Sequence, residues 1–290
     1  MLLSPYNRAP SMNVPRAAHF FLAPILLAAA VALSGIASAE SLLPLETEEA
    51  KPLPSGSVEM VAGVSYFRNL RFPEFTAAGA IHEQDLIKGP QIAFRIGAGD
   101  WAEIQASYEF ISIDEDTIAG HHDKYGGGDA RLHTKVRLLR EQGYWPGLGI
   151  RFGTKLPTSS KSSGLGLGTT DFFAGILLAK TVRSVRTVGN VSLLVLGNPV
   201  AAQDPLRAIG LGLSVARAIT NEFEAVGEVN GHMEPFGSAI NPGLESRGVF
   251  RLAGRYTHDL LRFDLGLLVG MTSRDPSFGV SAGATYVFGR

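Results

Sequence analysis

The chain has 290 residues, of which 26 are basic and 27 acidic, and it contains 34 glycines and no cysteine. This near-neutral charge argues against a nucleic-acid-binding protein. The lack of cysteine excludes disulfides, thiolate metal sites and cysteine nucleophiles. Glycine is abundant for a soluble domain, and the glycines fall mostly on one face of alternating segments.

Residues 1–39 have the features of a secretory signal peptide. Arg8 and Arg16 precede an apolar run without acidic residues, and the small residues at 37–39 fit a cleavage site. The alternative, a membrane-spanning helix, is disfavoured because Pro24 interrupts the run. We therefore expect export through the Sec pathway.

Residues 40–56 combine three prolines with several glutamates. Such a composition predicts a flexible acidic segment that leads into the first strand. A binding role for this segment is the alternative. The rest of the chain, residues 57–290, is predicted to form one β-domain.

The last thirty residues give the clearest pattern. From Leu261 to Met271 the odd positions are apolar and the even positions are mostly charged or small, whereas from Phe278 to Phe288 the even positions are apolar. A period of two predicts an antiparallel hairpin. Each strand has about ten to twelve residues, which is what a tilted strand needs to cross a bilayer.

Ten similar segments precede this hairpin, although residues 169–183 and 186–196 alternate less cleanly. Short turns alternate with longer connections, which include residues 69–89, 114–127 and 233–246. This order is typical of outer-membrane barrels. We predict an all-β fold, a transmembrane antiparallel up-and-down β-barrel of about twelve strands in the cell outer membrane of a Gram-negative-type cell. Residues 278–288 should close the barrel against residues 58–66.

A soluble β-sandwich would also alternate, but its solvent face would favour threonine, lysine and glutamate. Here glycine alternates with charge, which suits a crowded barrel interior. The charged face is then the lumen, and opposite charges on neighbouring strands either brace the interior or form a basic stripe that attracts anionic solutes. The predicted lumen-lining residues are Arg95, Glu103, Glu109, Arg131, His133, Lys135, Arg137, Arg151, Lys155, Glu224, Glu228, Arg251, Arg255, Arg262 and Asp264.

Three short motifs carry a family resemblance. They are Gly-Gly-Gly-Asp at 126–129 before a basic strand, Lys-Leu-Pro-Thr at 155–158, and Gly-Leu-Gly-Thr-Thr-Asp at 166–171. Together with the closing hairpin, the chain resembles the outer-membrane family named for the meta-pathway of phenol degradation. The resemblance implies a channel for hydrophobic or aromatic compounds. The chain departs from the family pattern at Ser159, where glycine is usual. In addition, Phe288 is followed by two further residues, whereas outer-membrane barrels commonly end on the aromatic residue itself.

No constellation in the sequence indicates an enzyme or a cofactor. The pair His121 and His122 with Asp123 lacks further residues at metal-ligand spacing, so we expect no metal site. We predict a channel that passes small hydrophobic or aromatic solutes by diffusion. The alternative is a structural or partner-binding barrel whose lumen is closed by salt bridges and whose loops at 69–89 and 233–246 contact a partner. A barrel-embedded lipid enzyme is the third alternative. Besides a solute, the expected partners are outer-membrane lipid and the barrel-assembly machinery.

Overall fold

The computed structural model describes the part of the chain that follows the predicted signal peptide. All of it belongs to the second of the two units into which the chain divides, Ser34–Arg290. The described residues are 45–73, 81–117, 120–159, 165, 168–197, 205–233, 246–273 and 275–288.

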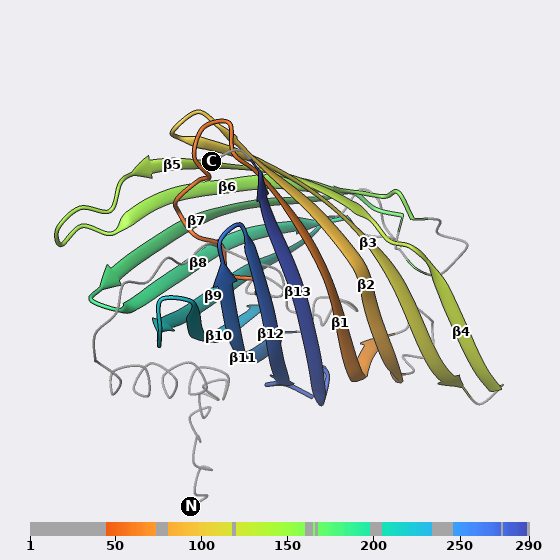
Figure 1. The fold of residues 1–290 in the computed structure, drawn as a ribbon. Helices are drawn as coiled ribbons and strands as arrows, with labels where there is room; N and C mark the ends of the chain where they lie inside the picture. The colour runs from red at the N-terminus through yellow and green to blue at the C-terminus, as the bar shows by residue number, and fades with distance from the viewer. Residues whose placement is uncertain are drawn as a thin grey trace, which may run out of the picture. The chain divides into compact units, whose positions relative to one another are not determined.

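Thirteen strands account for most of these residues, and each pairs antiparallel with its neighbours (Figure 1). Within the described residues no helix is long and apolar enough to cross a membrane. The strands are β1 (Val58–Pro73), β2 (Ile81–Ala98), β3 (Ala102–Thr117), β4 (Gly120–Gly127), β5 (Ala130–Leu139), β6 (Gly147–Leu156), β7 (Asp171–Val182), β8 (Val185–Leu196), β9 (Leu206–Ala218), β10 (Phe223–Met233), β11 (Arg247–His258), β12 (Leu261–Gly270) and β13 (Phe278–Phe288).

The sheet closes into a barrel with twelve strand positions. Strands β4 and β5 both pair with β3. Strand β4 pairs with its second part, from Phe110 to Thr117, and β5 with its first part, from Ala102 to Ser107, so β4 and β5 together fill one strand position. Strand β1 joins β2 on one side and β13 on the other. The register runs from Val58 opposite Phe288 to Tyr66 opposite Val280. This confirms the predicted strand number and the predicted closure by the last hairpin.

The structure corrects two of the predicted long connections. Residues 69–89 are not a loop, because β1 continues to Pro73 and β2 already begins at Ile81. Residues 114–127 are not a loop either, since β3 runs to Thr117 and β4 fills Gly120–Gly127. Register shifts between Phe67 and Leu70 and between Lys88 and Gln91 interrupt the period of two in β1 and β2, so their extensions lack the alternation that marks the other strands. Of the proposed partner loop at 233–246, residues 234–245 lie outside the described part.

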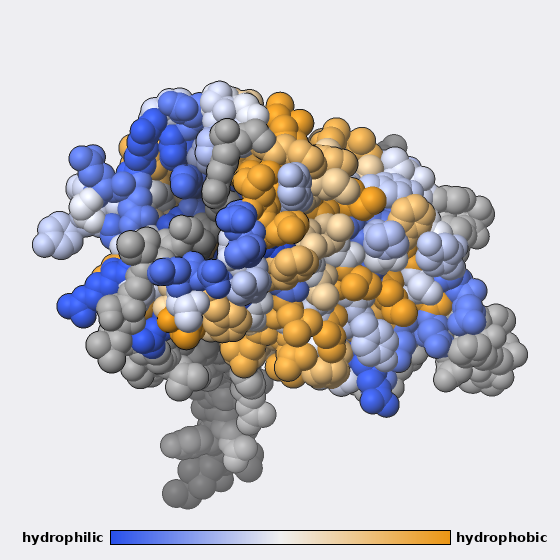
Figure 2. Space-filling model, in the orientation of Figure 1, coloured by the Kyte–Doolittle hydropathy of each residue, from blue (hydrophilic) through white to orange (hydrophobic). Residues whose placement is uncertain are grey.

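The two faces of the barrel wall have opposite chemistry. Along β12 the exposed side chains are Leu261, Phe263 and Leu265, and the buried ones between them are Arg262 and Asp264. Figure 2 shows the same outward face as an apolar band with hydrophilic side chains on either side of it. A soluble domain has the reverse arrangement, so this fold places its charges inside and its large apolar side chains outside.

Closure by β1 and β13 can be tested with cysteines, because the natural chain has none. Ala62 and Ala284 are partners in the register, and outward side chains of such a pair have Cβ atoms close enough for a disulfide. The double variant Ala62→Cys, Ala284→Cys should form an intramolecular disulfide on oxidation, seen as a mobility shift of the denatured chain.

The matched control is Ala62→Cys with Thr285→Cys, in which the second cysteine replaces a buried side chain of the lumen. A one-residue shift moves a side chain to the other face of a strand. Efficient crosslinking of this control, or none of the first pair, would contradict the register.

Candidate functional site in the barrel lumen

Residues 45–56 run through the lumen, and we call them the luminal strap. The strap joins β1 at a tight turn, in which the backbone N–H of Ser57 donates to the carbonyl of Pro54 at 3.0 Å and that of Gly56 to the carbonyl of Gly97 at 3.1 Å. This turn lies at the end of the barrel where the short connections are. The structure therefore differs from the predicted flexible segment over these residues, and contacts with the barrel wall give the reason.

The middle of the strap binds to charged residues of β2, β3 and β5. The carboxylate of Glu48 lies 3.0 Å from Nζ of Lys135 and 3.4 Å from the guanidinium of Arg95. Both cations also bind Glu103, at 3.1 Å and 2.9 Å, and the backbone N–H of Leu53 donates to Glu103 at 2.8 Å. Lys135 and Glu103 are fully buried. Their oppositely charged partners therefore offset the cost of burying the two charges.

The far end of the strap is held on the opposite wall by Glu228 of β10. Its carboxylate accepts hydrogen bonds from the backbone N–H groups of Glu46 and Thr47, at 3.0 and 2.7 Å, and from the Thr47 hydroxyl at 2.6 Å. Arg251 of β11 donates to the same carboxylate at 2.8 Å. A further ion pair joins Glu49 to Arg186 of β8. The strap thus crosses the lumen from β2–β5 to β10–β11.

Apolar contacts complete the fit of the strap. Ala50 packs with Leu177, Ala179 and Val188 of β7 and β8, and Leu45 packs with Ala216 and Val226. These inward apolar residues are the physical reason why the segments at 169–183 and 186–196 alternate poorly in the sequence.

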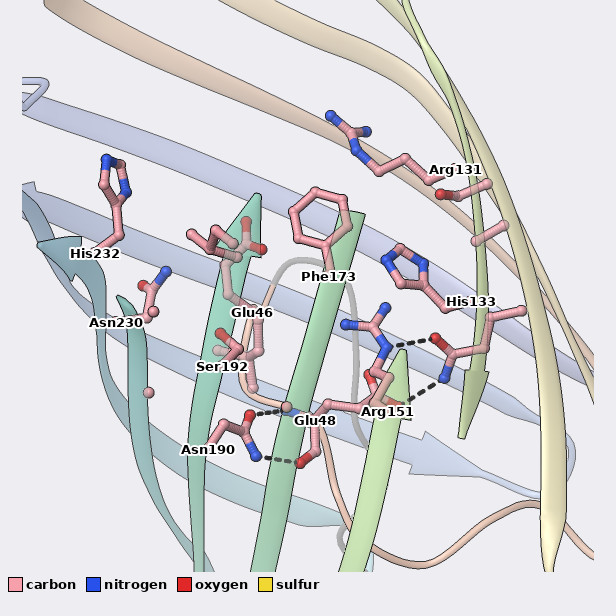
Figure 3. A pocket seen from close by; sticks show the side chains of 18 of the residues that line it. Glu46, Glu48, Arg131, His133, Arg151, Phe173, Asn190, Ser192, Asn230 and His232 are labelled. Atoms are coloured by element: carbon pink, nitrogen blue, oxygen red, sulfur yellow. Dashed lines mark hydrogen bonds between the residues drawn. The ribbon is translucent and has the colours of Figure 1, made fainter. Parts of the chain in front are cut away.

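A cavity of about 490 Å³ lies in the lumen beside the strap, and we call it the luminal chamber. Leu45, Glu46 and Glu48 of the strap form part of its wall. Figure 3 shows side chains from several strands pointing into it. The labelled ones from the barrel are Arg131, His133, Arg151, Phe173, Asn190, Ser192, Asn230 and His232.

The structure divides the predicted lumen residues into groups. Those that line the luminal chamber are Arg95, Glu109, Arg131, His133, Arg151 and Arg251. Those buried in ion pairs with these residues or with the strap are Glu103, Lys135 and Glu228. A separate cluster joins Glu224, Arg255, Arg262 and Asp264 near the short turns. Arg137 lies apart from the chamber, with its guanidinium over the ring of Trp101.

Lys155, the remaining predicted residue, explains why the three sequence motifs occur together. Its ammonium lies 2.7 Å from Asp171 and 3.4 Å from Asp129. Asp129 also accepts hydrogen bonds from the backbone N–H and hydroxyl of Ser159, and Asp171 accepts one from the backbone N–H of Gly197. The motifs therefore build one polar latch that joins the outer ends of β5, β6 and β7.

Several residues of the site were missed in the sequence. Glu46, Glu48 and Glu49 were predicted to lie in a flexible acidic segment with a binding role only as the alternative, and nothing local identifies their partners. Phe173 of β7 had a recoverable signal, because it shares a face with Asp171 and Gly175, although its strand alternates poorly. Glu59 of β1, which binds Arg95 at 2.8 Å, could have been found from the same parity argument.

The described side chains offer no group of three or more histidine, aspartate or glutamate residues that could hold a metal ion. The side chains of His121 and His122 are not among those described. His133 contacts the ring of Phe173, with centroids 5.6 Å apart.

The fold is similar to that of solved outer-membrane proteins. An outer membrane channel from Pseudomonas putida F1 matches with a TM-score of 0.65 and 12% identity, over 84% of this chain and 100% of that chain. The translocator domain of the autotransporter NalP from Neisseria meningitidis matches with a TM-score of 0.48 and 9% identity, over 81% and 90%. At such identities the likeness shows the fold alone. No family model matches the chain, and no curated protein matches it, so the family resemblance stays a prediction.

The buried ion pairs around the strap should contribute more to the free energy of unfolding than the exposed ion pairs do. The substitution Lys135→Met leaves Arg95 as the cation that Glu48, Glu59 and Glu103 share, and breaking a buried pair in this way costs about 3–5 kcal/mol. We expect a clear decrease in the free energy of unfolding, measured by urea titration in lipid vesicles. Lys180→Met removes a partly exposed pair with Glu141 and should cost about 0–1 kcal/mol. Equal effects of the two substitutions would contradict this account.

Proposed function

We propose that this chain is an outer-membrane channel that admits small solutes to the luminal chamber. The observation that carries the proposal is the inverted wall, apolar outside and charged inside, around a cavity of about 490 Å³. In lipid every backbone polar group must be paired within the protein, and a closed barrel achieves this. The apolar outer face then contacts lipid, and the charges face the lumen.

The short connections would lie on the periplasmic side, as in other outer-membrane barrels. The luminal strap starts at that end, so it narrows the path on the periplasmic side of the chamber. The chamber and the outer mouth lie beyond it. Solute passage therefore requires either room beside the strap or displacement of the strap from the wall.

Charge balance in two of the three ion-pair clusters that hold the strap favours its displacement, while in the third Arg186 loses Glu49 and keeps Glu141 at 3.9 Å. Without Glu48, the cations Arg95 and Lys135 still have the carboxylates of Glu59 and Glu103, two against two. Likewise Arg251 still has Glu228. The wall residues of these two clusters therefore stay neutral when the strap leaves, and its departure does not strand a buried charge in them.

The dense ion pairs of the lumen favour a second candidate, a structural barrel that stays closed. In that case the strap would be a permanent plug, and the chamber would be an enclosed space without traffic. The two candidates differ in one measurable property, the passage of ions or solutes through the purified protein.

Deletion of residues 45–53 should separate these candidates. It removes the strap segment that contacts Lys135 and Glu228 but keeps the turn before β1. In planar bilayers we expect a higher single-channel conductance than that of the full chain, because the lumen widens on its periplasmic side. Glu228→Gln, which weakens the anchor of the strap, should raise the open probability. Glu222→Gln, a change at an exposed turn next to the same strand, should not.

A barrel that conducts no ions with or without the strap would overturn the channel proposal and favour the structural barrel.

Contact with lipid gives a depth-dependent prediction. Leu265 lies in the middle of β12 and is 60% exposed, whereas Leu261 is its first residue. An arginine on the lipid face costs about 2–4 kcal/mol at the bilayer midplane and about 0–1 kcal/mol near the interface. Leu265→Arg should therefore lower the free energy of unfolding in vesicles far more than Leu261→Arg. Equal and small effects would contradict a membrane-spanning barrel.

A further inference from the structure

We propose that the luminal chamber binds a small organic carboxylate, with the carboxylate on Arg151 and the hydrocarbon part against Phe173. This inference deepens the proposed function, because it names the class of solute that the channel would hold. It replaces a purely hydrophobic solute with an anionic one. The reasons lie in the charges, the geometry and the packing of one wall of the chamber.

The wall formed by β2, β3, β5 and β6 has more cations than carboxylates. Glu109 is shared by Arg131, at 2.8 Å, and Lys88, at 3.9 Å. Arg151 lines the same chamber and makes no ion pair with any of the described residues. With the adjoining cluster around Lys135 included, five cations (Lys88, Arg95, Arg131, Lys135 and Arg151) meet four carboxylates (Glu48, Glu59, Glu103 and Glu109). A surplus of one positive charge remains, and it attracts an anion.

The guanidinium of Arg151 is held in place with its outer edge unused. Its Nε donates to Oε1 of Gln105 at 3.0 Å, and the amide of Gln105 donates in turn to Glu48 and Glu103 at 2.9 and 2.7 Å. Within the described part of the chain its two terminal nitrogens have no hydrogen-bond partner. An arginine fixed in this way can bind a carboxylate through two parallel hydrogen bonds.

An aromatic surface lies next to this cation. Phe173 of β7 is only partly buried, although it lies in the lumen, and its ring packs against His133. Figure 3 shows His133, Phe173 and Arg151 around the same hollow. The residue opposite Arg151 on β7 is Gly175, and the residue opposite Phe173 on β6 is Gly153. The space above Gly153 is taken by His133, and that above Gly175 by Ser192. The room for a flat hydrocarbon group on the ring is therefore the chamber itself, which Phe173 and Arg151 both line.

The acids of the chamber do not favour a cation instead. Glu48 is already bound by Lys135, Arg95 and Gln105. Glu46 is more exposed, but its carboxylate lies 3.6 Å from Arg251. Each carboxylate on the strap therefore lies next to a cation of the wall. Arg151, in contrast, has no carboxylate partner among the described residues.

The probe is 4-fluorobenzoate, titrated into the purified full chain in detergent and followed by fluorine NMR. Its neutral comparator is 4-fluorobenzyl alcohol, which keeps the ring and loses the charge. We expect saturable binding of the carboxylate and at least about tenfold weaker binding of the alcohol, since loss of a charged hydrogen-bonded pair has that size.

Arg151→Gln should weaken binding of 4-fluorobenzoate by about tenfold, because the amide lacks the charge and the fork, and Phe173→Leu should weaken it by less. The matched controls are Phe172→Leu, on the same strand but 57% exposed on the outer face, and Arg140→Gln, at an exposed turn. Both should bind as the natural chain does. Resistance of the folded barrel to unfolding in cold detergent checks assembly of each variant.

The proposal is overturned if the natural chain shows no saturable binding, if the alcohol binds as tightly as the carboxylate, or if Arg151→Gln binds unchanged. Should Arg151→Gln not assemble, the comparison of the two probes and the Phe173→Leu variant still decide. Binding in detergent needs no passage through a membrane. A barrel that binds 4-fluorobenzoate but conducts no ions would therefore contradict the channel proposal and support the binding site.

Discussion

Burial of charge inside the barrel is the constraint on which the rest of the structure depends. The wall turns its large apolar side chains outward, so the lumen is filled by polar groups instead of a hydrocarbon core. A buried charge without a partner costs several kcal/mol, and the fully buried cations must therefore meet carboxylates of neighbouring strands. Arg95, Lys135 and Glu103 satisfy this requirement on neighbouring strands, as do Arg251 and Glu228.

The luminal strap uses the same networks as its binding surface. Glu48 joins the cluster around Lys135, and the backbone of Glu46 and Thr47 meets the carboxylate of Glu228. Two of the wall clusters do not need the strap to be neutral. Arg95 and Lys135 pair with carboxylates of the wall, and Arg251 pairs with Glu228. Its apolar contacts, made by Leu45 and Ala50, are small. The ion pairs and hydrogen bonds to buried wall residues therefore provide most of the attachment of the strap.

Much of the fold could be predicted because strand alternation is a local property. A period of two in β12 and β13 placed Arg262 and Asp264 on one face without any knowledge of their partners. The outer parts of β1 to β4 were missed for a related reason. In β1 and β2 the register shifts at Phe67–Leu70 and Lys88–Gln91 interrupt the period of two, and in β4 (Gly120–Gly127) Tyr125 is the one large apolar residue, so no apolar alternation marks it.

The strap could not be predicted, because its contacts are all distant in sequence. Glu46 and Glu228 are 182 residues apart, and an acidic stretch with prolines looks the same whether it is solvated or bound. One indirect indication of the strap is present in the sequence. Strands β7 and β8 carry apolar residues such as Leu177 and Val188 on a face that should be polar. A loss of alternation inside a barrel thus indicates that something packs there.

The position of Arg151 follows from these two arrangements together. The strap supplies Glu48, which through Gln105 fixes the guanidinium, yet the strap does not reach its terminal nitrogens. Most other cations of the described lumen pair with carboxylates of the wall or of the strap, but Arg151 lies opposite Lys135 on one side and Gly175 on the other. The cation is therefore left to the chamber, and a fold that neutralises charge elsewhere in this lumen keeps one cation available for an anion that comes from outside.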